Sequence, residues 1–227
     1  MFASIGALVI GALIGVRHAF EPDHLTAVTT LVVETRSARR GAALGALWGI
    51  GHTISLLIVG TILIITGTTL PPAATAAFEL CVAAMLIVLG VRSVWRAFRD
   101  DPHAPERVHR HGGHAHVHVG PSPHVHIAGR TLAWRPLVVG LVHGLAGTGA
   151  ITALVFAKLP DAASRVSYIA LFGLGSVAGM AIATGVAGAS ICRLADGPRR
   201  RSVLAVATGL GSIVLGVVWG LPELAAL

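Results

Sequence analysis

A run of nine residues near the start of the chain, 17–25, contains five ionisable side chains inside an otherwise apolar stretch. Apolar residues fill almost every position of 2–16 and again of 25–33. The first of these stretches has about 15 residues, whereas a helix needs roughly 20 to cross the hydrocarbon core of a bilayer. A membrane-crossing helix must therefore continue through 17–25, although each central charge costs about 2.5–3.5 kcal/mol on insertion scales. Charges at such a cost are typical of a functional site.

The composition of the whole chain is also that of a membrane protein. Of the 227 residues, 54 % are hydrophobic and 12 % are charged, and the mean hydropathy is +0.79. A net charge of +7 would suggest nucleic-acid binding in a soluble domain, but here the basic residues lie in short segments between apolar ones. We therefore expect contact with lipid and none with nucleic acid. Cys81 and Cys192 lie in apolar surroundings, which predicts neither a disulfide nor a thiolate metal site.

Six hydrophobic segments follow one another, and each is expected to be a transmembrane helix. They are 2–33, 41–66, 73–98, 136–159, 165–193 and 202–221. Fourteen of the 17 Lys and Arg residues lie in the last turns of the first, third and fifth segments or in the connections that follow them. Because basic loops stay in the cytoplasm, these connections are predicted to be cytoplasmic and both termini to lie outside, in a bacterial-type inner membrane. The first segment has no basic residues before it, so we expect a retained helix and no cleaved signal peptide.

The two halves of the chain resemble each other at a shift of about 125 residues. Three matches carry this similarity: 46–51 with 170–175, 87–91 with 213–217, and Gly15 and His18 with Gly140 and His143. Because each half holds three segments, the second half would enter the membrane from the opposite side. The prediction is an all-α fold of six transmembrane helices in a 3+3 inverted repeat, with halves 1–98 and 136–227 joined by a linker, 99–135. Chance similarity between apolar sequences is the alternative.

A proline interrupts the charged run and changes what its histidines can do. His18 and His24 are six residues apart, so they would point to different faces of an unbroken helix. Pro22 has no backbone N–H, and its ring clashes with the carbonyl four residues earlier, that of His18. The segment 2–33 is therefore predicted to break near Pro22, which lets His18, Asp23 and His24 converge.

Two more histidines, His52 and His143, lie inside apolar segments. A single histidine in such a helix is often a packing residue, but the repeat pairs His143 with His18. Gly144 and Gly147 are predicted to break the fourth segment, as Pro22 breaks the first. Imidazoles with few carboxylates and no thiolate suit Ni, Co, Zn or Cu better than Mg or Ca. The candidate metal ligands are therefore His18, Asp23, His24, His52 and His143.

Two charged residues of the run are assigned a different role. Glu21 lies one helical turn after Arg17, so the simplest expectation is a charge pair that neutralises the guanidinium. Metal ligation by Glu21 is the alternative.

The linker 99–135 contains a dense group of histidines mixed with Gly and Pro. They are His103, His109, His111, His114, His116, His118, His124 and His126. The segment has no apolar periodicity and is expected to be disordered and cytoplasmic. Its histidine pattern predicts an auxiliary metal buffer or sensor, separate from the five candidate ligands inside the apolar segments. A solvated spacer is the alternative.

These motifs resemble those of a known family. Residues 17–25 are similar to the His-x-x-x-x-Asp-His signature of nickel/cobalt transporters, and 51–53 resemble their Gly-His-Ser/Thr motif. The six-segment pattern is similar to short members of the nickel/cobalt (NiCoT/NicO) superfamily, including urease-accessory-type proteins. The resemblance implies a permease without enzymatic activity or prosthetic group. Its substrate would be Ni²⁺ or Co²⁺, and proteins that mature nickel enzymes are candidate partners.

The direction of transport depends on how this chain departs from that family. Glu21-Pro22 stands where full-length uptake members usually carry Asp-Ala, and together with the His-rich linker it is closer to the efflux branch. The intact Asp23-His24 ending favours uptake, with efflux as the alternative. A non-transporting sensor or chaperone for a nickel enzyme is a further alternative. An intramembrane hydrolase is disfavoured because the chain has no Gly-x-Ser-Gly or His-Glu-x-x-His motif.

Overall fold

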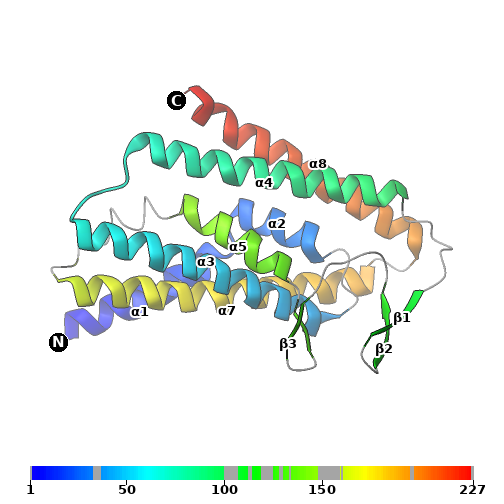
Figure 1. Cartoon of the computed structure of the whole chain (residues 1–227), viewed down its shortest axis with the longest axis horizontal. Coiled ribbons are helices and arrows are strands. Elements are labelled where there is room, and N and C mark those ends of the chain that lie inside the picture. Colours follow the sequence, from blue (N-terminus) through cyan, green and yellow to red (C-terminus); the bar gives the residue numbers. More distant parts are fainter. Residues whose placement is uncertain are drawn as a thin grey trace.

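The computed structural model describes most of the chain as helices and short strands (Figure 1). The described residues are 2–32, 37–99, 107–111, 114–118, 125–127, 130–132, 134–147, 159, 161–194 and 197–225. The helices in these ranges are α1 (Phe2–His18), α2 (Pro22–Val32), α3 (Ala38–Thr66), α4 (Pro72–Arg99), α5 (Trp134–Ala146), α7 (Ala162–Leu194) and α8 (Pro198–Ala225). The strands are β1 (Arg107–His111), β2 (His114–His118), β3 (Val125–Ile127) and β4 (Arg130–Leu132).

The long helices are those of a membrane protein, as the sequence predicts. Four of them, α3, α4, α7 and α8, are long and apolar enough to cross a bilayer. Large apolar side chains are exposed along them, as Ile58, Ile62 and Ile65 are on α3. Such surfaces suit lipid rather than water.

The first and fourth predicted segments are not single long helices. Residues 2–33 are divided into α1 and α2. The apolar part of α1, Val9–His18, is shorter than the 18 residues of a membrane-spanning candidate. The 13-residue α5 covers the start of segment 136–159, and 148–158 lie outside the described residues. In Figure 1 the short helices α2 and α5 lie between two pairs of long helices, α3 with α7 and α4 with α8.

A tight turn separates α1 from α2 at the charged run. α1 ends at His18, whose carbonyl accepts the backbone N–H of Glu21 at 3.0 Å. Pro22 is the first residue of α2, where a missing N–H leaves no helical hydrogen bond unmade. The proline therefore begins a helix, and the chain changes direction just before it.

Close backbone contacts at glycine join α1 to α7 and α5 to α3. A Cβ atom on Gly15 would collide with the carbonyl of Phe172, and one on Gly140 with the carbonyl of Trp48. The two contacts correspond at a shift of about 125 residues in both partners. Small residues that let helix backbones approach are the usual means of packing in a bilayer.

The α4–α8 pair shows the same correspondence. A Cβ on Gly90 would lie 2.5 Å from the carbonyl oxygen of Gly209, and one on Gly216 would lie 2.7 Å from that of Ala83. Ser212 also donates its hydroxyl to the carbonyl of Leu86 at 2.7 Å. The two long helices are therefore held backbone to backbone along their length.

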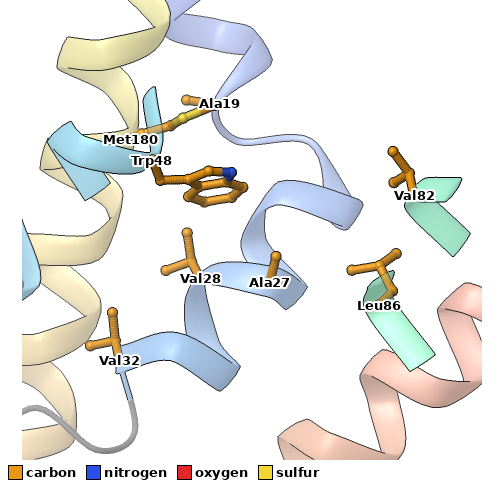
Figure 2. Packing of buried hydrophobic residues seen from close by; sticks show 8 residues of the cluster. All are labelled: Ala19, Ala27, Val28, Val32, Trp48, Val82, Leu86 and Met180. Atoms are coloured by element: carbon orange, nitrogen blue, oxygen red, sulfur yellow. The ribbon is translucent and has the colours of Figure 1, made fainter. Parts of the chain in front are cut away.

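One buried apolar cluster surrounds α2 (Figure 2). Trp48 of α3 is its largest fully buried member and lies next to Val28 of α2, with Leu86 of α4 and Met180 of α7 on other sides. The short helix after the turn is thus fixed by packing against three of the long ones.

The His-rich linker differs from the prediction in its described parts. The helix bundle itself is all-α, as predicted. In the described parts of the linker, where disorder was expected, β1 pairs with β2 and β3 with β4, each pair antiparallel. The physical reason is an alternation of histidine with other residues at a period of two, as in 107–111 and 114–118, which suits a strand. His103 and His124 lie outside the described residues.

Replacing Gly140 by alanine adds one methyl group where α5 touches the backbone of α3. We expect G140A to destabilise the fold by about 1–3 kcal/mol, the usual cost of overpacking a tight contact. Gly211 of α8 has no atom within 4 Å of a Cβ at its position, so G211A is the matched control. Thermal unfolding in detergent, followed by circular dichroism, compares them. Equal midpoints for the two variants would contradict the close α3–α5 contact.

Candidate metal centre

Four helices bring the five candidate ligands into one cluster. His18 ends α1, Asp23 and His24 lie in the first turn of α2, His52 lies in α3 and His143 in α5. The His24 ring centre is 4.4 Å from that of His18, 5.5 Å from that of His52 and 4.1 Å from that of His143. The turn before Pro22 lets His18 and His24 meet. On one continuous helix, side chains six residues apart would point to different faces.

The cluster is buried inside the helix bundle. His24, His52 and His143 are at most 2 % exposed, while the side chains of His18 and Asp23 are 13 % exposed. An ion held here would have lost most of its contact with bulk water, and the protein must therefore replace its hydration shell.

Asp23 ties two of the imidazoles together. Its Oδ1 accepts the Nδ1–H of His24 at 3.1 Å, and its Oδ2 accepts the Nε2–H of His143 at 2.9 Å. A carboxylate that fixes the orientation of a ring and the position of its proton is a common support for metal-ligating histidines. Asp23 thus joins α2 to α5 across the cluster.

Glu21 takes a role that differs from the predicted one. Its Oε2 accepts the Nδ1–H of His18 at 2.9 Å, and the expected pair with Arg17 is not formed. The reason is that α1 ends at His18, so Arg17 and Glu21 are not one turn apart on a common helix. The half-exposed Glu21 therefore orients His18, as Asp23 orients His24.

These hydrogen bonds leave one set of ring nitrogens unused. Among the described residues, His18 Nε2, His24 Nε2, His143 Nδ1 and both nitrogens of His52 are buried without a hydrogen-bond partner. Buried polar atoms in native proteins are rarely left in this state. Because a neutral imidazole nitrogen without a proton is a metal ligand, the arrangement fits a borderline divalent cation such as Ni²⁺, Co²⁺ or Zn²⁺.

Trp48 is a site residue that the sequence reasoning missed. Its ring stacks on His24 at 5.4 Å between centres and meets His143 edge-on at 5.5 Å. The signal was present, because Trp48 precedes His52 by one helical turn and so faces the same side of α3. The indole forms an apolar wall that holds two of the imidazoles in place.

The two predicted glycine breaks behave differently. Gly144 lies within α5, where a Cβ would meet the carbonyl of His52, so its prediction as a helix break is wrong. α5 ends at Ala146, and Gly147 follows it. A Cβ on Gly147 would lie 3.8 Å from His18 Nε2 and 4.0 Å from His52 Cε1. A glycine at this point keeps the space beside the two imidazoles open.

Comparison with known proteins places the chain in a family. Over 213 residues it is 30 % identical to the urease accessory protein UreH of Bacillus sp. (strain TB-90), covering 94 % of this chain and 90 % of that protein. Over 198 residues it is 26 % identical to the chloroplast protein FOR GROWTH AND FERTILITY 2 of Arabidopsis thaliana, covering 86 % of this chain and 50 % of that one. No solved structure matches.

The family match spans nearly the whole sequence. Residues 4–227 match the NicO family, whose description is "High-affinity nickel-transport protein". The resemblance predicted from the charged run and the Gly-His-Thr motif is thereby confirmed, and it agrees with a buried histidine cluster inside a membrane-type helix bundle. The chain belongs to the NicO family of high-affinity nickel-transport proteins.

Proposed function

We propose that the protein moves Ni²⁺ or Co²⁺ across the membrane through the cluster of His18, Asp23, His24, His52 and His143. The observation that carries this proposal is the convergence of buried, unpartnered imidazole nitrogens from four helices beside one carboxylate. Membership of a nickel-transport family supports the choice of ion. The ion is the substrate, and the chemistry needs no prosthetic group.

The arrangement explains how a hydrated dication could enter a bilayer. Imidazole nitrogens would replace its water molecules, and the Asp23 carboxylate would offset part of its charge. Neutral ring nitrogens bind such ions well but release them more readily than thiolates would. A site without cysteine therefore suits an ion that must leave again.

An inverted repeat gives this site a means of opening to both sides. The matched glycine contacts of α1 with α7 and of α5 with α3 support such a repeat, as does the pairing of His18 with His143. In this proposal the site lies near the bilayer midplane between two three-helix halves, which rock about it. The basic connections face the cytoplasm and both termini face outward.

The direction that we propose is uptake. The Asp23-His24 ending matches the uptake signature, whereas Glu21-Pro22 and the His-rich linker favour the alternative, efflux. The relative from Bacillus is named a urease accessory protein, which supports delivery of the ion to proteins that mature a nickel enzyme.

The linker would serve as an auxiliary metal buffer on the cytoplasmic side. In the described hairpin, His109 lies opposite His116 and His111 lies opposite His114 in the strand register. The register thus brings histidine opposite histidine at two positions of the hairpin. Paired histidines at this spacing support loose capture of metal ions.

Removing a ligand should stop transport. We expect His18→Ala or Asp23→Asn to lower ⁶³Ni²⁺ and ⁵⁷Co²⁺ flux into proteoliposomes by at least about tenfold, as loss of metal-site support commonly does. Asp161→Asn is the matched control, because Asp161 is exposed, caps α7 by accepting the Ser164 N–H at 2.8 Å, and lies outside the cluster. Unchanged flux in His18→Ala or Asp23→Asn would show that the site assignment is wrong.

Direction is tested in proteoliposomes that hold the protein in one orientation. Uptake predicts that metal loaded on the side of the termini moves to the side of the linker, with or without an imposed proton gradient. Net flux only from the linker side would establish efflux instead. No flux in either orientation from stably folded protein would favour the sensor or chaperone alternative.

The buffer role predicts a change in binding without a loss of transport. Replacing 107–132 by a Gly/Ser linker of equal length should lower the number of Ni²⁺ ions bound per chain while flux in proteoliposomes persists. Equilibrium dialysis with metal analysis measures the first quantity. An unchanged ion count would contradict metal capture by the linker.

A further inference from the structure

The five candidate ligands do not form one coordination sphere. Their ligand atoms fall into two groups, each within 4.8 Å: His18, His24 and His52 in one, and Asp23, His24 and His143 in the other. His24 alone belongs to both. The ring centres agree, since His52 and His143 are 6.1 Å apart and His24 lies nearer to each of them.

The two nitrogens of the His24 ring explain this division. Nδ1 faces Asp23 at 3.1 Å, and Nε2 is buried without a partner. Because the two nitrogens of an imidazole point in different directions, one ion cannot bind both. His24 therefore offers one ligand atom to each group.

In the first group, each imidazole has a ring nitrogen without a hydrogen-bond partner, which is free to bind an ion. The hydrogen bond to Glu21 fixes the proton of His18 on Nδ1 and leaves Nε2 free, and His24 Nε2 is free for the same reason. His52 has both nitrogens unpartnered, and Gly147 leaves space beside His18 and His52. All three ligands of this group are imidazoles, with no carboxylate among them.

In the second group, hydrogen bonds between the ligands already occupy the atoms that would bind an ion. Asp23 spans His24 and His143, so an ion entering here must replace the two N–H···O contacts. In return it gains a carboxylate ligand, which the first group lacks. The two groups are thus adjacent sites of different charge.

We propose that the metal ion occupies these two sites in turn, with His24 as a ligand in both; this rests on the proposed transport function. While His24 Nε2 holds the ion, its proton stays on Nδ1 and bonds Asp23. When the ion moves to His24 Nδ1, the His24 proton moves to the vacated Nε2, and the His143 proton moves from Nε2 to its unpartnered Nδ1, so both rings stay neutral. The ion passes between sites without returning to water, and neither site needs to bind it tightly enough to trap it.

The test measures Co²⁺ binding by the purified full-length chain with its eight linker histidines changed to glutamine. Visible absorption distinguishes a three-imidazole site from one with a carboxylate. His52→Ala should retain Co²⁺ with the spectrum of the Asp23 site, and His143→Ala should retain it with that of the His52 site. His24→Ala should lose both, with affinity falling by at least about tenfold relative to either other variant.

Two outcomes would overturn the proposal. One is that His52→Ala and His143→Ala each abolish binding while keeping the unfolding midpoint of the parent chain; the other is that His24→Ala retains both spectra. If the alanine variants do not fold, His52→Gln and His143→Gln, which keep a polar side chain, are measured in the same way. Because binding is read at equilibrium, absent flux with two distinct spectra would refute transport and leave the two sites standing.

Discussion

The contact on which the rest of the site depends is the Asp23 carboxylate between His24 and His143. It accepts an N–H from its neighbour His24 at 3.1 Å. It also accepts one from His143 at 2.9 Å, and this second contact connects the start of α2 with α5, two short helices from different halves of the sequence. A charge in this buried place is costly unless it is paired, and here both oxygens accept N–H groups. The same two contacts set the protons of both rings, so they also decide which nitrogens are left for a metal ion.

The surrounding fold serves to hold this contact in place. Glycines at 140 and 144 bring α5 against the backbone of α3, which places His143 and His52 on facing sides. Trp48 then stacks on His24 and closes the cluster on one side. Because the supporting contacts are backbone to backbone or ring to ring, the imidazoles have little freedom to rotate away.

The sequence predicted the position of the helix break and the members of the cluster because both depend on local chemistry. Proline at position 22 limits the backbone whatever surrounds it, and His143 was found through its match to His18. The charge pair of Arg17 with Glu21 was wrong because it assumed a helix that in fact ends at His18. Trp48, the α5 contact of Gly144 and the linker strands depend on which segments meet in space, and a single sequence does not contain that information directly.

In the proposed mechanism the transported ion binds among these imidazoles, inside the membrane-embedded helices. Anomalous X-ray scattering from crystals of the protein grown with Ni²⁺ locates the ion. An anomalous peak is expected within coordination distance of a His24 ring nitrogen. A protein that transports Ni²⁺ but shows peaks only at the His-rich linker, with none beside His24, would contradict this mechanism.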